Sequence, residues 1–123
     1  MHSDLRQILG QRGEQLATEH LRRCGFQILE RNYRTRWGEL DIVAFDGRTL
    51  AFCEVKTRRT GGGAAPLEAV HGVKQQRVRK MAGQWLVERT ERPRADEIRF
   101  DAIGVILDGQ DRLVSLEHLA GAF

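Results

Sequence analysis

Two apolar runs joined by an Asp-Gly pair constrain the fold of this chain most strongly. Residues 39–45 (ELDIVAF) and 49–55 (TLAFCEV) have the apolar, strand-forming composition of β-structure, and Asp46-Gly47 lies between them. This pattern is typical of a β-hairpin, because glycine accepts the positive φ of a type I′ turn. Both faces of each run are largely apolar, which favours a hairpin covered on both sides. The chain is therefore predicted to fold around a central sheet.

The remaining periodicity predicts two helices that pack on this sheet. Apolar residues at helical spacing indicate one helix from Gly13 to Cys24 and a second over Val70–Arg89. Further strands are expected at 26–31, 97–107 and 112–116, and a helical turn at 117–120. Residues 33–38 are expected to form a loop or an irregular strand, and residues 58–66 a loop. The order α-β-β-β-α-β-β predicts a mixed α/β class, with the strands at 49–56 and 97–107 parallel. Residues 1–10 are expected to form a flexible lead-in to one domain over residues 11–123.

Composition excludes several classes of protein. The 123 residues are 41% hydrophobic and 30% charged, so we expect the chain to be neither disordered nor membrane-spanning. The longest apolar run, Ala102–Leu107, is far too short to span a bilayer, and the first residues have no pattern of a signal peptide. Cys24 and Cys53 lie in apolar surroundings without metal-ligand spacing, so we expect buried thiols in a reduced, cytoplasmic protein.

Acidic residues occur where the hairpin is otherwise apolar. If a two-residue turn pairs Phe45 with Arg48, Asp41 lies opposite Phe52 and Glu39 opposite Glu54. Since cross-strand partners share a face, Glu39, Asp41, Glu54 and Lys56 then project from one side of the hairpin. A three-residue loop would break this alternation.

A divalent cation would explain this convergence of acids. Asp41 and Glu54 would be diagonal neighbours whose Cα atoms lie roughly 7–8 Å apart. Two carboxylates at that separation repel each other when buried, and Mg²⁺ (or Mn²⁺), which prefers oxygen ligands, would reverse that penalty. The alternative is that Lys56 neutralises Glu54 and that Asp41 pairs with Arg34 or Arg36.

The ordered set Asp41, then Glu54-Val55-Lys56 on the next strand, resembles the core of the PD-(D/E)xK nuclease superfamily. That superfamily includes type II restriction endonucleases and archaeal Holliday junction resolvases. More closely, the chain resembles the YraN-like family of uncharacterised bacterial proteins, in the stretches 13–17 (GEQLA), 32–34 (NYR), 38–42 (GELDI), 52–58 (FCEVKTR) and 99–101 (RFD). Leu40 stands where the superfamily has its proline, a departure that is common among resolvase-like members.

The resemblance implies a restriction-endonuclease-like fold and a role for each matching residue. Asp41, Glu54 and the Val55 carbonyl would hold the metal ion, and Lys56 would position or activate the attacking water. Glu14, on the first helix, matches the helical glutamate of the family, and Gln75 matches a polar position on the second helix. Without the resemblance, Glu14 would be interpreted as an acid that favours the dipole of its helix.

Basic residues flank the proposed site and predict a nucleic-acid partner. The net charge is only +3, so the local arrangement matters more than the total. Arg34 and Arg36 precede the hairpin, Arg58 and Arg59 follow it, and Lys74 and Arg77 lie on the second helix. Such a rim would bind phosphates without reading sequence.

The sequence therefore predicts a metal-dependent endonuclease that cuts structured or branched DNA, with dimerisation possible by analogy. Two alternatives stay open: a non-catalytic nucleic-acid-binding or scaffold module that keeps the fold, and a structural protein whose carboxylates only make salt bridges. Asp101 lies in an apolar strand beside Arg99, which favours a buried structural pair over a metal ligand. The four histidines are scattered along the chain without paired spacing, so none is expected to bind zinc.

Overall fold

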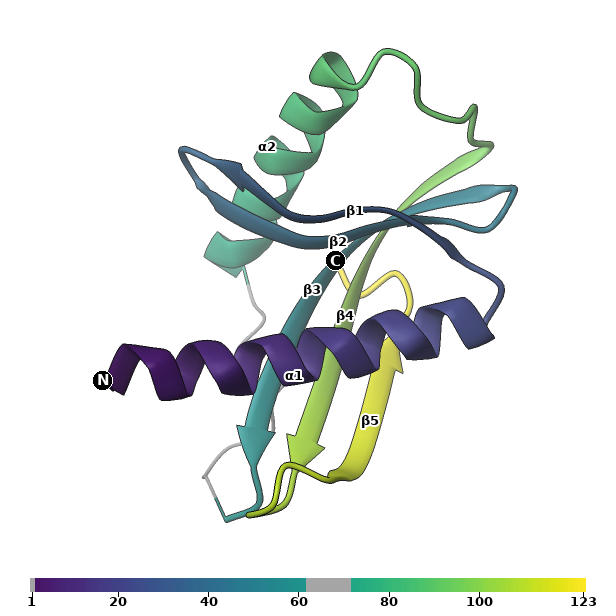
Figure 1. Ribbon diagram of the computed structural model, residues 1–123. Helices are drawn as coiled ribbons and strands as arrows, with labels where there is room; N and C mark the ends of the chain where they lie inside the picture. The colour runs from purple at the N-terminus through teal and green to yellow at the C-terminus, as the bar shows by residue number, and fades with distance from the viewer. Residues whose placement is uncertain (1, 62–71) are drawn as a thin grey trace.

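A computed structural model describes residues 2–61 and 72–123 as two helices and a five-stranded sheet (Figure 1). The elements are α1 His2–Arg23, β1 Gln27–Thr35, β2 Gly38–Phe45, β3 Thr49–Arg59, α2 Gly72–Glu88, β4 Glu97–Leu107 and β5 Leu113–Leu119. This order and the mixed α/β class are those predicted from the sequence. The strands lie in the order β1-β2-β3-β4-β5, and β3 and β4 are parallel as predicted, while the other neighbours are antiparallel.

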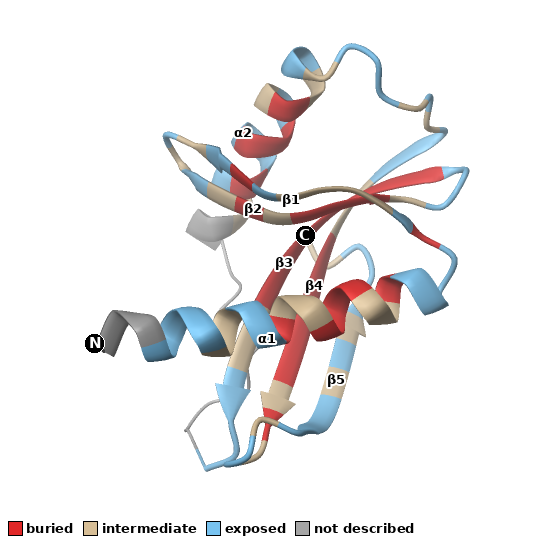
Figure 2. Cartoon of the chain, in the orientation of Figure 1, coloured by how far each residue is buried: buried red, intermediate tan, exposed pale blue. Residues whose placement is uncertain are grey.

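The sheet is covered by one helix on each face. On one face, Leu16, Ala17 and Leu21 of α1 pack in a cluster with Cys53 and Val55 of β3. On the other face, Phe52 packs with Val78, Met81 and Trp85 of α2. Because successive side chains of a strand point to opposite faces, β3 supplies apolar residues to both clusters. Figure 2 shows the result, with buried residues concentrated along β3 and β4 and on the inner sides of both helices.

Strand β2 turns about its own axis at Asp41. Leu40 belongs to the α2-side cluster, whereas Ile42 and Ala44 belong to the α1-side cluster. In a regular strand, residues two apart share a face, so the side chains change sides between Leu40 and Ile42. The pairing of β2 with β3 extends from Phe45 to Ile42. Beyond that point β1 and β2 curve away from the other three strands (Figure 1).

The turn of the central hairpin differs from the predicted one. Phe45 pairs with Leu50 and not with Arg48, which shifts the register by two residues. The Asp46 carboxylate accepts hydrogen bonds from the amides of Arg48 (2.9 Å) and Thr49 (2.7 Å), and the Asp46 amide donates to the Thr49 carbonyl (3.2 Å). The turn is therefore centred on residues 47 and 48. A shift of two residues keeps the predicted faces of the paired residues 42–45 but replaces every predicted cross-strand partner. The change of sides at Asp41 breaks the alternation that predicted Glu39, Asp41, Glu54 and Lys56 on one side of the hairpin.

Both elements before the hairpin are longer than predicted. Helix α1 begins at His2 instead of Gly13, so most of the segment 1–10 is helical; Leu9 extends the apolar face and packs against the α1-side core. Strand β1 continues to Thr35, so residues 33–35 take the strand alternative and not the loop, because Tyr33 is buried in the α2-side cluster. The Thr35 hydroxyl accepts from the Trp37 amide and donates to the Gly38 carbonyl, both at 3.0 Å, and closes the tight turn to β2.

Other corrections concern the C-terminal strand and one cysteine. Residues 117–119 continue β5 instead of forming a helical turn, because Ala102, Ile103 and Gly104 of β4 supply pairing partners up to Leu119. Cys24 is exposed and not buried, since it follows the last residue of α1, whereas Cys53 is buried as predicted; both are free thiols.

The predicted loop 58–66 and the start of the second helix fall partly outside the described residues. Strand β3 includes Arg58 and Arg59, which the sequence placed in that loop, and residues 62–71 are not described. Neither of the helices in the described ranges is long and apolar enough to cross a membrane.

Candidate functional site

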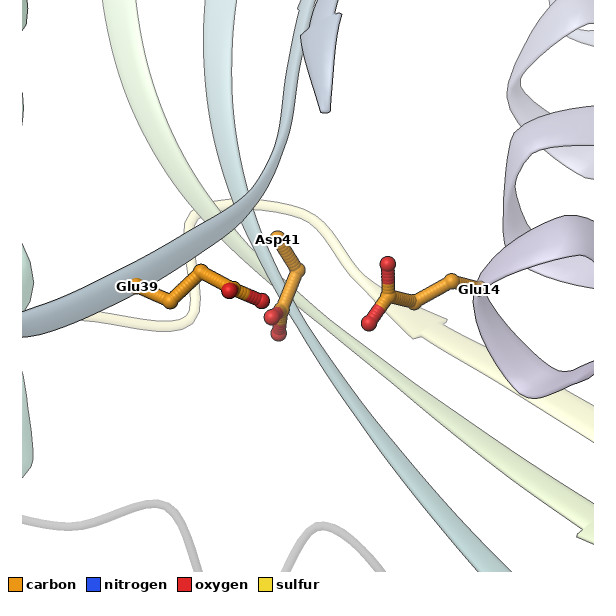
Figure 3. A group of neighbouring side chains, drawn as sticks. All are labelled: Glu14, Glu39 and Asp41. Atoms are coloured by element: carbon orange, nitrogen blue, oxygen red, sulfur yellow. The ribbon is translucent and has the colours of Figure 1, made fainter. Parts of the chain in front are cut away.

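Three carboxylates, one from α1 and two from β2, meet where β2 leaves β3. Glu14 of α1 and Glu39 and Asp41 of β2 each offer an oxygen atom, and these atoms lie within 4.8 Å of one another. Figure 3 shows Glu14 and Glu39 approaching Asp41 from opposite sides. Among the residues that the structure describes, Glu54 is not part of this group. We call Glu14, Glu39 and Asp41 the acidic triad.

Asp41 is held by the backbone of the neighbouring strand. The Val55 amide of β3 donates a hydrogen bond to Asp41 Oδ2 at 2.7 Å. This side-chain bond occurs just beyond Ile42, where the β2–β3 pairing ends. The bend of β2 therefore separates β2 from β3 and directs the Asp41 carboxylate toward Val55 and the other two acids of the triad.

Glu14 reaches the triad because α1 approaches β3 closely at the preceding residue. Gly13 is buried, and a Cβ atom built there would lie 1.8 Å from the Thr57 Oγ1 atom. Any side chain at Gly13 would force Thr57 or the helix to shift, since real Cβ contacts essentially never occur below 3.0 Å. Glycine at this position sets the distance between Glu14 and the strands.

Glu14 and Glu39 are bridged by the amide of Asn32 from β1. Asn32 Nδ2 donates to Glu14 Oε1 at 2.6 Å and to Glu39 Oε1 at 3.0 Å. Two arginines lie at the edge of the same cluster: Arg34 pairs with Glu39 at 3.5 Å, and Arg31 lies 3.9 Å from Glu14. These cations compensate the triad only in part, because Arg34 is 85% exposed to solvent.

The electrostatics of the triad favour a bound proton or a cation. Burial raises the pKa of Asp41 to about 7 against the lowering effect of the Val55 amide, and the charges of Glu14, Glu54 and Glu39 add to the rise. Burial also raises the pKa of Glu14; the Asn32 hydrogen bond opposes this rise, and Glu39 adds to it. A carboxylate with a pKa near neutrality is a candidate functional group, because like charges and desolvation are unfavourable without a compensating cation.

Glu54 and Lys56 form a second part of the site. The Lys56 Nζ atom lies 3.6 Å from Glu54 Oε1, and Glu54 is only 7% exposed. Glu54 and Glu39 both line a cavity of about 170 Å³ between β2, β3 and α2, together with Arg77 and Met81. The structure thus places Glu54 beside Glu39 at this cavity and close enough to Asp41 to raise its pKa.

The predicted basic residues occupy different surroundings. Arg77 lines the cavity of Glu39 and Glu54, and Arg34 pairs with Glu39. The Arg36 guanidinium stacks on the Trp37 ring at 4.6 Å, Arg58 is exposed, and Arg59 pairs with Asp111 at 2.6 Å across the far ends of the strands. The predicted pairing of Asp41 with Arg34 or Arg36 is not what these contacts show.

The two predicted polar residues of the second helix are less informative. Gln75 is half-buried on α2. The side chain of Lys74 lies outside the described part of the chain.

Asp101 is the centre of a separate, structural network. The Arg99 guanidinium donates two hydrogen bonds to its carboxylate (2.8 and 2.9 Å), and Gly121 donates a third (3.0 Å). His118 Nε2 lies 2.8 Å from Asp101 Oδ2, and the His118 ring in turn contacts His20 at 3.0 Å. Burial raises the pKa of Asp101, but these hydrogen bonds outweigh it and hold the pKa at about 2. The predicted pair with Arg99 is confirmed, and Asp101 is fully buried.

Sequence reasoning missed two members of the site. Glu39 was placed on the acidic face of the hairpin without a role, and Asn32 had no predicted function. Asn32 has a left-handed backbone (φ 54°), which asparagine tolerates better than most residues, but nothing in the local sequence marks it as a bridge.

Comparison with known proteins places the chain in a family. The model of the uncharacterised protein family UPF0102 matches residues 13–105, which include the acidic triad, Glu54 and Lys56. The chain belongs to the UPF0102 family. A UPF0102 protein of Nocardia farcinica is 46% identical over 96% of this chain and 91% of its own length. A UPF0102 protein of Geobacter sulfurreducens is 46% identical over 94% of this chain and 88% of its own, and one of Acidothermus cellulolyticus is 44% identical over 96% and 95%.

Proposed function

We propose that this UPF0102 protein is a divalent-metal-dependent endonuclease that hydrolyses phosphodiester bonds, with structured or branched DNA as the expected substrate. The observation that carries the proposal is the acidic triad: three carboxylate oxygens within 4.8 Å of one another, beside Glu54 and Lys56. The proposal includes a restriction-endonuclease-like fold of the PD-(D/E)xK type, a cytoplasmic location and a possible homodimer.

The donor set fits Mg²⁺ or Mn²⁺. All of the triad's ligand atoms are carboxylate oxygens, which hard divalent cations prefer. Burial first and the neighbouring carboxylates second raise the pKa of Asp41, and a bound cation would offset both effects. Asp41, Glu14 and Glu39 would hold the ion, with Glu54 and the Val55 carbonyl as further candidates. When bound, such an ion supplies a more acidic water and positive charge for the scissile phosphate.

The remaining side chains have roles that follow from their positions. The Lys56 ammonium, next to Glu54, would orient the attacking water or stabilise negative charge that develops on the phosphate. Arg77, at the shared cavity, and the exposed Arg34, Arg36 and Arg58 would contact backbone phosphates. Such contacts give affinity and position the strand, but they do not select a sequence.

The test is cleavage of a panel of junction, flap, single-stranded and duplex DNA with Mg²⁺ and with Mn²⁺. We expect the parent protein to cut at least one branched substrate and Asp41→Asn and Glu54→Gln to abolish cleavage while circular dichroism shows a folded protein. Asp96→Asn, at an exposed acid in the connection between α2 and β4, is the matched control and should cut normally. Cleavage by both site variants at the parent's rate would refute the assignment.

A non-catalytic nucleic-acid-binding module is the second candidate, and the ion pairs of Arg31 and Arg34 favour it. These arginines already compensate part of the charge on Glu14 and Glu39 without a metal ion. Calorimetric titration with Mn²⁺ separates the candidates. Retained DNA binding without Mn²⁺ binding would support the module, and stoichiometric Mn²⁺ binding lost in Asp41→Asn would support the nuclease.

A further inference from the structure

Asn32 combines an unusual backbone with an unusual set of contacts. It lies inside β1, between the pairs Arg31↔Ile42 and Tyr33↔Leu40, which places it opposite Asp41. Its φ of 54° is left-handed, whereas an extended strand requires a negative φ. Such a backbone is unfavourable for a residue with a side chain and persists where the surroundings hold it in place. The strand therefore accepts a local distortion at the residue that faces the acidic triad.

The contacts show what this distortion achieves. Both hydrogens of one amide nitrogen are used, one toward Glu14 of α1 at 2.6 Å and one toward Glu39 of β2 at 3.0 Å. The two glutamates come from elements far apart in the sequence and carry charge of the same sign. A neutral double donor between them offsets their repulsion and fixes the direction of both carboxylates. Figure 3, which draws the three acids of the triad, shows both glutamates directed toward Asp41.

We propose that Asn32 is a positioning residue that holds Glu14 and Glu39 in the geometry in which the triad binds a divalent cation. This inference rests on the proposed function, because it assigns Asn32 a role in that same site. The side chain is well suited to the task, since aspartate would add a fourth carboxylate and glycine would keep the backbone but lose the amide. Asn32 acts through the glutamates and is not itself assigned a bond to the metal ion.

The first test compares Mn²⁺ binding by the parent and by Asn32→Gly. Glycine accepts the left-handed backbone, so this substitution removes the amide without straining the chain. We expect calorimetry, well below the melting temperature of either protein, to show Mn²⁺ binding weakened roughly 10-fold or more, as for other groups that orient metal ligands. Asp111→Gly, at the other left-handed residue that is not glycine in the described chain (φ 62°), is the matched control and should bind as the parent does. Equal binding by the parent and Asn32→Gly would overturn the proposal, because a purely structural asparagine changes stability and not the affinity of the folded protein.

The second test needs no metal ion and uses a double-mutant cycle with Glu14→Ala, which removes the acceptor of the Asn32 amide, in urea and EDTA. If the amide holds Glu14 against the other acids, Asn32→Gly lowers the urea midpoint more in the parent than in the Glu14→Ala background. The entropy that glycine adds to the unfolded chain is the same in both backgrounds and cancels. Equal shifts in the two backgrounds would overturn the positioning role even if the parent binds no Mn²⁺. If the parent binds no Mn²⁺ but the shifts in urea midpoint differ between the two backgrounds, the proposed metal site is refuted. The bridge by Asn32 is then still supported.

Discussion

Replacing Asp41 by asparagine should stabilise the protein above neutral pH, although Asp41 lies at the centre of the candidate site. Burial and the charges of Glu14, Glu54 and Glu39 raise the pKa of Asp41 from 3.8 to about 7. Between pH 3.8 and about pH 7, the Asp41 carboxyl group is therefore protonated in the folded protein and ionised in the unfolded chain. By linkage, ionisation of Asp41 costs no stability below pH 3.8, an increasing amount as the pH rises, and its full amount above pH 7.

The size of the effect follows from the size of the pKa change. At about 1.4 kcal/mol for each pH unit, the change from 3.8 to about 7 corresponds to about 4 kcal/mol at pH 8. At pH 5 the same calculation gives about 1.7 kcal/mol, so the gap in unfolding free energy between variant and parent should widen by about 2.5 kcal/mol from pH 5 to pH 8. Relaxation of the half-buried site makes these figures upper bounds. The side-chain carbonyl oxygen of the Asp41→Asn variant can still accept the Val55 amide, so the backbone contact is retained.

Urea unfolding of the parent and Asp41→Asn in EDTA, from pH 5 to pH 9, measures this gap. A gap that widens toward alkaline pH is the expected result, and addition of Mn²⁺ at pH 8 should stabilise the parent and not the variant. A gap that stays constant between pH 5 and pH 8, or one in which the variant loses stability as the pH rises, would show that Asp41 is not held in a desolvated acidic environment.

Two further predictions concern the supports of the fold and of the site. Gly13→Ala should destabilise the protein by about 1–3 kcal/mol in urea unfolding, because its Cβ atom would meet Thr57 Oγ1. Adding Thr57→Ala should restore part of this loss. An unchanged urea midpoint in Gly13→Ala would contradict the close approach of α1 to β3. Asp101→Asn should cost about 3–5 kcal/mol at pH 7, because it leaves Arg99 and His118 without their buried carboxylate. Since the pKa of Asp101 is held at about 2, the difference in stability between the parent and Asp101→Asn should shrink as the pH falls from 4 toward 2. A difference in melting temperature that does not change with pH would contradict this.

Local sequence predicted the elements of this protein better than it predicted their ends. The order of helices and strands and the parallel pair β3–β4 follow from periodicity and from the turn residues, which act over a few positions. The ends of β1 and β5 depend on partners from elsewhere: burial of Tyr33 extends β1, and pairing with β4 extends β5 to Leu119. The predicted register of the hairpin was wrong by two residues. The Asp46 carboxylate binds the amides of Arg48 and Thr49, and this turn replaces the two-residue turn in which Phe45 would pair with Arg48.

The sequence by itself determined which acids are present and that Glu39, Asp41 and Glu54 lie near one end of a buried hairpin. Only the tertiary structure decided that Asp41 meets Glu14 and Glu39 and that Glu54 shares a cavity with Glu39. The reason is that three features place these carboxylates: the bend of β2, the approach of α1 at Gly13 and the Asn32 bridge. Each depends on contacts between segments that are distant in the chain, and local patterns do not encode such contacts.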